Sequence, residues 1–255
     1  MLTCAIPTLN AAATLEETLR SLRQQSDVHA VIVDSGSTDG TLDIAARFGI
    51  PVRFVERGNM YRAVNAGLID AQTPWLTYLN ADDLVHSGAF AKLVRLGADV
   101  AYGDCDFIDA DGRYLSTFLS ADPPDLLALY RAGVQGLPQP ATIFTRELFA
   151  TLGGFNTDYR FAADADFFLR ALQHGARFAR LREPVCAFRL HASQQTVMHG
   201  AEMAAEIARI AQAAGGASMK ARLAFARWRL RNARNYAARL VRTGRLRLRE
   251  RPRVD

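Results

Sequence analysis

The first hundred residues alternate short apolar runs with segments whose apolar residues recur at helical spacing. The runs predict strands at residues 2–6, 30–33, 52–55 and 75–79, and the periodic segments predict helices at residues 13–24, 40–48 and 61–71. Strands and helices that alternate at this spacing form parallel βαβ units with right-handed crossovers. In such sheets, ligands bind at the carboxyl ends of the strands.

The pattern changes after about residue 100. Two apolar runs, residues 100–108 and 114–118, flank the turn sequence Asp109-Ala110-Asp111-Gly112 and are predicted to form a hairpin. Further strands are predicted at residues 141–144, 177–181 and 185–190, further helices at residues 164–174 and 201–214, and a hinge at Gly215-Gly216. The sequence therefore predicts an α/β domain followed by a helical extension.

The composition is that of a globular protein. The 255 residues are 49% hydrophobic and 22% charged, which suits one large α/β domain with or without an appendage. No apolar run approaches the roughly 20 residues that span a bilayer, and the first residues lack the pattern of a signal peptide. The three cysteines match no zinc or redox spacing, so we expect free thiols and a cytoplasmic location.

The charge is divided unevenly along the chain. Residues 217–255 carry 13 Lys and Arg against 2 Asp and Glu, a net charge of +11, whereas residues 1–216 carry 18 against 24, a net charge of −6. Within the basic part, one set of apolar residues recurs at helical spacing: Met219, Leu223, Ala226, Leu230, Ala237 and Val241. We call this set the tail stripe.

Two interpretations of the basic tail remain open. A basic amphipathic helix suits an anionic membrane surface, which would hold the protein peripherally at the inner membrane face. Alternatively, the tail stripe covers the domain and leaves the arginines in solvent. Nucleic-acid binding is disfavoured because the body is acidic and no recognition motif is present.

Polar clusters follow the predicted strands or open a predicted helix. They are Pro7-Thr8-Leu9-Asn10, Asp34-Ser35-Gly36-Ser37-Thr38-Asp39-Gly40-Thr41, Asn80-Ala81-Asp82-Asp83 and Asp164-Ala165-Asp166. The adjacent carboxylates of Asp82 and Asp83 repel each other at a buried strand end, and a hard divalent cation would relieve that repulsion. The alternative is that one of them caps a helix at residues 87–96. Asp34 is placed to accept a hydrogen bond from a nucleobase, whereas Asp39 suits a turn that caps the next helix.

Taken in order, these clusters resemble the motifs of the family 2 glycosyltransferases. The resemblance covers residues 2–197 and includes two later segments, Gly153-Gly154-Phe155 with the stretch that begins at Ala163-Asp164, and Phe188-Arg189-Leu190-His191. It implies the GT-A fold, a Rossmann-like nucleotide-binding half within a mixed sheet. The implied division is residues 1–99 for the nucleotide-sugar, residues 100–197 for the acceptor, and residues 198–255 as a helical basic extension.

The resemblance also implies roles for single residues. Thr8, Asn10 and Asp34 would contact the nucleoside, Asp82 the ribose, Asp83 a Mn²⁺ or Mg²⁺ ion, and His191 the diphosphate or the metal, while Asp164 would be the catalytic base. The family's mechanism is an inverting single displacement. The sequence departs from the family pattern at Asn80 and Ala163, where many members carry carboxylates.

We therefore expect an inverting glycosyltransferase of surface or extracellular glycan synthesis. It would move a sugar from a nucleotide-diphosphate donor to a hydroxyl of a saccharide or lipid-linked acceptor. A sugar nucleotidyltransferase would need a Gly-rich basic loop after the first strand, which residues 7–12 do not provide. A catalytically inactive scaffold that binds nucleotide-sugar remains open because of Asn80 and Ala163.

Overall fold

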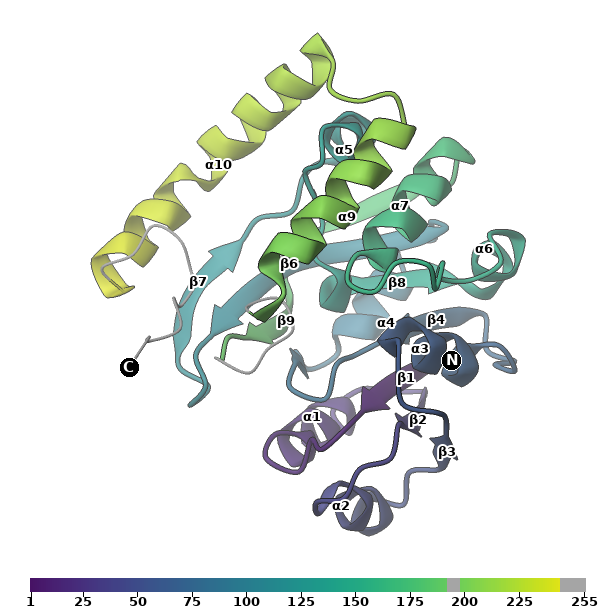
Figure 1. The fold of residues 1–255 in the computed structure, drawn as a ribbon. Helices are drawn as coiled ribbons and strands as arrows, with labels where there is room; N and C mark the ends of the chain where they lie inside the picture. Colours follow the sequence, from purple (N-terminus) through teal and green to yellow (C-terminus); the bar gives the residue numbers. More distant parts are fainter. Residues whose placement is uncertain (192–197, 244–255) are drawn as a thin grey trace.

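One mixed sheet organises the computed structural model, which describes residues 1–191 and 198–243 (Figure 1). Within these residues the strand order is β3-β2-β1-β4-β8-β6-β9-β5, with β7 paired to β6. The strands are β1 Leu2–Thr8, β2 Val28–Asp34, β3 Val52–Phe54, β4 Trp75–Tyr78, β5 Leu84–Val85, β6 Val100–Ile108, β7 Tyr114–Phe118, β8 Thr142–Thr145 and β9 Phe178–Arg189.

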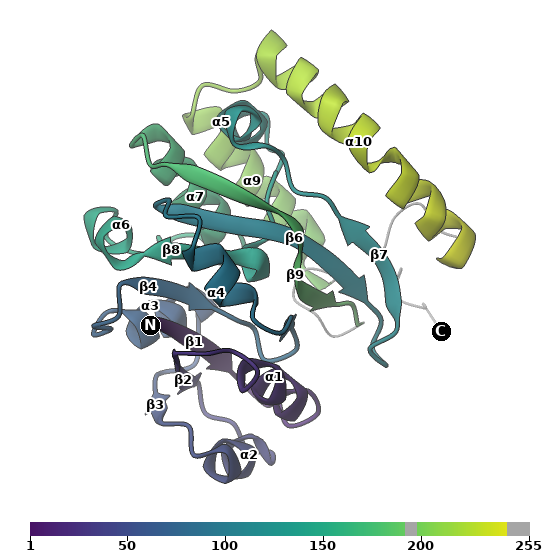
Figure 2. The same ribbon diagram turned by 180° about the vertical axis from the view of Figure 1, so that it is seen from behind.

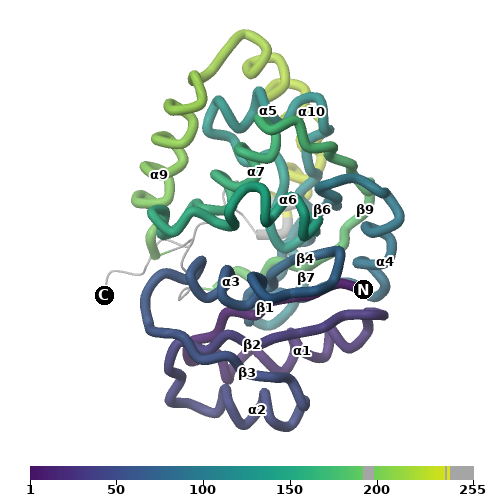
Figure 3. Tube along the Cα trace, turned by 90° about the vertical axis from the view of Figure 1, so that its right-hand side faces the viewer, coloured from purple at the N-terminus to yellow at the C-terminus, as the bar shows by residue number. Residues whose placement is uncertain are grey.

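Helices cover both faces of this sheet. They are α1 Leu15–Leu22, α2 Thr41–Phe48, α3 Met60–Leu68, α4 Ala89–Val94, α5 Pro123–Arg131, α6 Arg146–Thr151, α7 Ala163–Gln173, α9 Gly200–Ala213 and α10 Met219–Thr243. One core lies among α1, α2 and α4, and the other among α3, α5, α6, α7 and α9. Figure 3 shows α1 and α2 on one side of β1 and β2, with α3 on the other.

The first half of the sheet is parallel, as the alternating pattern predicts. β1 pairs with β2 and β4, and β2 pairs with β3. Side chains of β1 alternate between the cores, so that Cys4 and Ile6 pack with α1 while Ala5 packs with α3. Helix α3 approaches closely at Gly67, where a Cβ atom would lie 2.8 Å from Ala5 Cβ. The contact packs the end of α3 against the sheet, while its start follows the carboxyl end of β3.

The second half of the sheet is mixed, and here the sequence predictions need correction. The predicted hairpin is β6 and β7 with the expected bounds. The strands predicted at residues 177–181 and 185–190 are one strand, β9, because it continues alongside β6 through two shifts of register. β5, α5 and α6 were not predicted, since each has at most nine residues, too few to establish a period.

Helix α10 packs on the domain, but not through the tail stripe. Leu230 and Val241, two of its members, are 78% and 86% exposed. The opposite face of the helix is buried, with Ala221, Ala224 and Trp228 against the domain. Figures 1 and 2 show α10 lying along β7, far from β1–β3. In the described part of the chain, no helix combines the length and apolarity that crossing a membrane requires.

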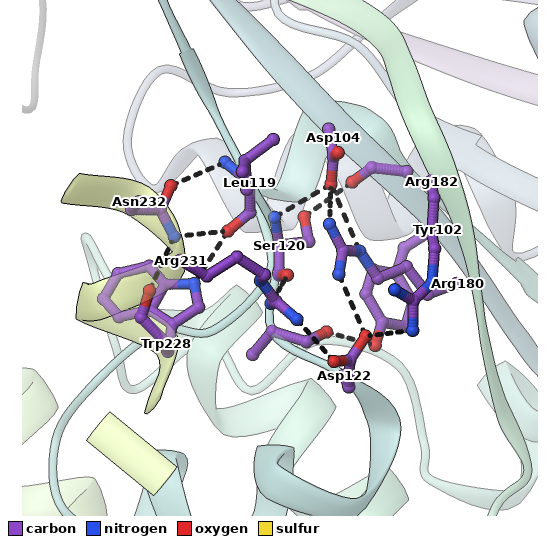
Figure 4. Close-up of polar contacts among 12 residues, drawn as sticks. Tyr102, Asp104, Leu119, Ser120, Asp122, Arg180, Arg182, Trp228, Arg231 and Asn232 are labelled. Carbon is purple, nitrogen blue, oxygen red and sulfur yellow. Dashed lines mark hydrogen bonds and ion pairs between the residues drawn. The ribbon is translucent and has the colours of Figure 1, made fainter. Parts of the chain in front are cut away.

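A polar cluster fastens α10 to the segment after β7 (Figure 4). Trp228 Nε1 donates to Leu119 O at 2.7 Å, and Asn232 Oδ1 accepts from Leu119 N at 3.0 Å. Arg231 donates to the Asp122 carboxylate and to Ser120 O. These bonds satisfy the polar atoms of a chain segment that would otherwise be buried without partners.

The same cluster continues inward to a buried ion pair. Arg180 Nη2 lies 2.7 Å from Asp104 Oδ1, and both side chains are at most 5% exposed. Arg180 also lies 2.9 Å from Asp122. Removing one partner of a buried pair leaves the other charge without compensation, which is costly.

We expect Asp104→Asn to lower the free energy of unfolding by roughly 2–4 kcal/mol, because Arg180 would lose a buried partner. Urea denaturation measures the change. The matched control is Arg113→Ala, which breaks an ion pair with Asp111 whose side chains are 76% and 67% exposed; that change should stay within about 0.5 kcal/mol. Equal effects of the two substitutions would contradict this account of the cluster.

Candidate active site

The carboxyl ends of β1 and β2 bring the first two polar clusters together. Thr8 lies opposite Asp34 in the parallel register, and its hydroxyl donates to Asp34 Oδ2 at 2.8 Å. Asn10, with a left-handed φ of 52°, accepts from Thr38 N at 2.8 Å through its side-chain oxygen. The predicted nucleoside residues therefore form one network, because the two loops bind each other.

Asp34 is the buried centre of this network. Its side chain is fully enclosed and accepts from the Thr8 hydroxyl, the Ser37 hydroxyl and the backbone N–H groups of Gly36 and Ser37. Burial alone would raise the pKa of this carboxyl, but the hydrogen bonds outweigh burial and lower it. In the structure these bonds shape the loop, and a nucleobase N–H that binds Asp34 would share an oxygen with one of these donors.

Asp39 makes the contacts expected of a residue that closes the turn before the next helix. Its carboxylate accepts from Thr41 N at 2.9 Å and from Ala12 N at 3.0 Å. Thr41 is the first residue of α2. Asp39 therefore closes the turn ahead of that helix and joins it to the loop that follows β1.

The adjacent carboxylates Asp82 and Asp83 have different surroundings. Asp83 is fully buried, and its two oxygens accept from Arg189 N at 3.1 Å and Asn80 Nδ2 at 3.2 Å. Burial and then the charge of Asp82 raise the pKa of Asp83 well above its usual range. Asp82 remains partly exposed, with its Oδ2 2.9 Å from His191 Nε2.

The helix-cap interpretation of these carboxylates is wrong. β5 follows Asp83 directly, and α4 begins only at Ala89 with Gly88 at its N-cap. Asp82 is 18% exposed and lies beside the His191 imidazole, whereas Asp83 is enclosed. Among the described residues, no group of three or more His, Cys, Asp and Glu side chains converges as a complete metal site.

Asp164 approaches the same region from the first turn of α7. Its Oδ1 accepts from Tyr61 Oη at 3.1 Å and Ala165 N at 2.9 Å. Burial raises the pKa of Asp164 to about 6, despite these bonds. By contrast, Asp166 is paired with Arg170 at 2.7 Å. Because Asp166 is neutralised by an arginine of the same helix, Asp164 is the candidate base of this segment.

Tyr78 relates the two carboxylate groups in space. It ends β4, and burial together with the charges of Tyr61, Asp164 and Asp83 raises the pKa of its phenol well above the usual value. The Tyr61 ring packs edge-on against Tyr78, and its hydroxyl contacts Asp164, so the start of α7 lies near the end of β4. The candidate site is the region around the end of β4, where Asp82 pairs with His191 and Asp164 lies beside Tyr61.

Arg189 has a structural role in the site that the sequence patterns did not predict. Its side chain is 3% exposed and donates to Asp82 O at 3.0 Å and Ala110 O at 2.9 Å. It also pairs with Glu17 of α1. The available signal was an arginine within the otherwise apolar run of residues 185–190, two residues before His191.

The comparisons with known proteins agree with this geometry. The family model "Glycosyl transferase family 2" matches residues 3–132. The PGL/p-HBAD biosynthesis glycosyltransferase of Mycobacterium bovis is 34% identical over 204 residues, which cover 73% of this chain and 75% of the relative. The chain belongs to glycosyl transferase family 2. It is therefore a glycosyltransferase, and the alternative hypothesis of a sugar nucleotidyltransferase is wrong.

Solved structures show that this family 2 member has the GT-A fold. Staphylococcus aureus TarS 1–349 in complex with UDP has a TM-score of 0.63 at 20% identity, and the match covers 91% of this chain and 71% of the TarS 1–349 chain. The mannosyltransferase PcManGT of Pyrobaculum calidifontis, in complex with GDP-Man and Mn²⁺, has a TM-score of 0.56 at 21% identity, with coverages of 94% and 84%. Glucosyl-3-phosphoglycerate synthase of Mycobacterium tuberculosis, in complex with Mn²⁺, UDP and glucosyl-3-phosphoglycerate, has a TM-score of 0.60 at 19% identity, with coverages of 86% and 81%.

We expect ¹³C NMR titration of the Asp164 carboxyl to give a pKa of about 6, against its ordinary 3.8. Since folding raises this pKa, protonation of Asp164 favours the folded state below pH 3.8, and the contribution is lost as the pH rises through about 6. Tyr61→Phe should raise the pKa further, because the phenol stabilises the carboxylate. A wild-type value near 4 would contradict the burial argument.

Proposed function

We propose that this family 2 enzyme is a metal-dependent, inverting transferase that acts on a nucleotide-diphosphate sugar. The observation that carries the proposal is the pairing of Asp82 with His191 just beyond the carboxyl end of β4, with the buried Asp164 carboxylate held by Tyr61 near the same strand end. In this proposal, residues 1–99 bind the donor, residues 100–197 serve the acceptor, and residues 198–255 are an extension.

The donor side of the proposal uses the loops after β1, β2 and β4. Thr8 and Asn10 contact the nucleoside, and Asp34 holds the loop that receives it. The side-chain oxygen of Asn80 is buried and has no hydrogen-bond partner among the described residues. An unsatisfied buried acceptor beside two carboxylates suits a donor hydroxyl or a cation.

The residues present fit a divalent cation. A carboxylate and an imidazole that lie 2.9 Å apart and are partly exposed (Asp82 Oδ2 and His191 Nε2) offer an oxygen and a nitrogen to the same point. We assign Mn²⁺ or Mg²⁺ to Asp82 and His191, with Asp83 holding the strand end behind them. The bound cation would stabilise the negative charge of the leaving nucleoside diphosphate.

Asp164 is the proposed base. An acceptor hydroxyl must lose its proton as it attacks the anomeric carbon, and a carboxylate with a pKa of about 6 is ionised at neutral pH while remaining basic. The Asp166–Arg170 ion pair supports this assignment by excluding the other carboxylate of the segment. One base suffices for a single displacement with inversion, without a covalent nucleophile.

The proposed acceptor is a hydroxyl of a lipid-linked saccharide or glycolipid in surface glycan synthesis. The support is the mycobacterial relative, whose name places it in PGL/p-HBAD biosynthesis.

We expect Asp82→Asn and Asp83→Asn to separate the two carboxylates. Asp82→Asn should abolish the gain in UDP affinity that Mn²⁺ brings and leave the melting temperature nearly unchanged, because Asp82 is partly exposed. Asp83→Asn should lower the melting temperature, because the buried carboxylate accepts from Arg189 N. Calorimetry with UDP or GDP, with and without Mn²⁺, measures the first effect. If Asp83→Asn alone removes the Mn²⁺ dependence, the original assignment of the metal to Asp83 is right.

We also propose that the outer face of α10 binds an anionic membrane surface. Met219, Leu223, Leu230 and Val241 of the tail stripe are 56–86% exposed. Lys220, Arg222, Arg227, Arg229 and Arg234 are exposed along α10, which contains no acidic residue. Apolar side chains flanked by cations suit the boundary between acyl chains and anionic headgroups. This surface would place the enzyme peripherally at the inner membrane face, beside a lipid-linked acceptor.

The double variant Leu223→Gln/Leu230→Gln should weaken co-sedimentation with phosphatidylglycerol vesicles by roughly tenfold or more, because each leucine would lose apolar burial. Its melting temperature should be unchanged, since both side chains point away from the domain. Ile69→Gln, at a side chain 68% exposed on α3's end, is the control and should bind as wild type does. Wild-type protein that ignores these vesicles at low salt, or a dimer that the double variant abolishes, would refute the membrane proposal.

A further inference from the structure

The loop ahead of α7, residues 156–162, is held on one side by α3. Asn59, at the N-cap of α3, donates from Nδ2 to Thr157 O and Tyr159 O, each at 2.8 Å. The Tyr61 hydroxyl, in the first turn of α3, lies 3.3 Å from Phe161 O and shares its one proton between this carbonyl and Asp164. The loop backbone is therefore fixed against the helix that also contacts Asp164.

On its other side, this loop is held by one carboxylate of α9. Glu206 Oε1 accepts from Arg160 N at 2.9 Å, and Glu206 Oε2 accepts from Phe161 N at 2.8 Å and Ala162 N at 2.9 Å. Ala162 is the N-cap of α7 and has no side chain that can accept a hydrogen bond. The Glu206 carboxylate therefore binds the N–H groups at and just before the N-cap, rather than the N2 and N3 groups that a capping side chain accepts, and its negative charge beside the helix start is favoured by the helix dipole.

Two further contacts join α9 to the same loop. The His199 ring stacks on Phe161, with centroids 4.8 Å apart. The Arg209 guanidinium lies over the Tyr159 ring, 5.4 Å from its centroid. These contacts lie beside the three hydrogen bonds of Glu206, so α9 and its N-cap contact loop residues 159–162.

Asp164 follows the held loop after a single intervening residue, Ala163. The Tyr61 hydroxyl lies 3.3 Å from Phe161 O and 3.1 Å from Asp164 Oδ1. A shift of the loop would therefore change the distance between Tyr61 and Asp164, and with it the direction in which the carboxylate points.

We propose that Glu206 is a positioning residue for Asp164, and that α9 is consequently part of the acceptor side of the active site. The inference rests on the proposed function, because it takes Asp164 as the base. It extends that function to a helix that lies beyond residue 197 and carries none of the motifs on which the family resemblance is based. The extension is then needed for turnover as well as for any membrane contact.

The negative charge of Glu206 also affects Asp164, because it raises the pKa of the Asp164 carboxyl. Burial is the main cause that raises the pKa of Asp164, and the negative charge of Glu206 adds to it. The other titratable groups around Asp164 are Tyr61, Tyr78 and Tyr130, whose phenols have raised pKa values. They stay neutral at physiological pH, so among these four neighbours only Glu206 adds a charge.

Steady-state kinetics of Glu206→Gln tests the proposal. An amide cannot accept three N–H bonds, so we expect kcat to fall roughly tenfold or more, with the donor KM unchanged. The acid limb of the kcat profile should move to lower pH, because a neighbouring negative charge is lost. Glu147→Gln, at an exposed glutamate in the first turn of α6 that makes none of these loop contacts, is the matched control. It should leave kcat and the acid limb unchanged.

Glu206→Asp separates geometry from charge. The shorter side chain withdraws the acceptors but keeps the negative charge, so kcat should fall while the acid limb moves less. Hydrogen exchange at the amides of residues 160–162 should accelerate in both Glu206 variants, which reports the loop without turnover. If Glu206→Gln matches the control in kcat, acid limb and exchange, Glu206 does not position the loop.

A double variant distinguishes this inference from the proposed base. If Glu206 acts through Asp164, Glu206→Gln/Asp164→Asn should turn over no more slowly than Asp164→Asn alone. A further drop by the full factor of Glu206→Gln would overturn the inference. If Asp164→Asn keeps wild-type turnover, the proposed base is wrong, while faster exchange at residues 160–162 would still support the hold on the loop.

Discussion

The hydrogen bond from Arg189 N to the buried carboxylate of Asp83 joins the two halves of this enzyme. Asp83 follows β4 in the parallel half, and Arg189 ends β9 in the mixed half. A buried carboxylate without partners is costly, so its two oxygens fix the strand ends that donate to them. His191 is brought beside Asp82 by this constraint, because it lies two residues beyond Arg189. The candidate donor site depends on a residue that need not touch the donor.

A second constraint acts from the opposite side of the site. Helix α7 presents Asp164 only while the loop before it is held, and that loop is fixed by α3 and α9 rather than by its own sequence. Donor and acceptor groups thus come from elements distant in the chain, which meet around Tyr78. Because the helices that hold them pack on one continuous core, changes in α9 can reach the chemistry without contact with the substrate.

Much of the fold could be predicted from the sequence, because local patterns determine it. The alternating pattern gave the parallel strands, and the turn at residues 109–112 gave the β6–β7 hairpin. The sequence could locate the candidate site, but it could not distinguish the roles of neighbouring residues within it. Asp82 and Asp83 are equivalent in any local pattern, and only the long-range partner Arg189 distinguishes them. The sequence predicted the tail stripe correctly as one face of a helix, but it left open whether this face contacts the domain or a membrane. Helix α10 is apolar on two faces, and periodicity does not show which of them packs on the domain. Glu206 carried no motif, and its partners are backbone groups that no side-chain pattern reveals.

The most direct test of this account is the identity of the ligands around the bound cation. Electron spin-echo spectroscopy of the Mn²⁺–UDP complex detects nitrogen nuclei coordinated to manganese. We expect an imidazole nitrogen signal in the wild-type enzyme and in Asp83→Asn, and its loss in His191→Gln. A Mn²⁺–UDP complex that binds normally but gives no imidazole signal, or one whose signal survives His191→Gln, would contradict the placement of the cation at Asp82 and His191.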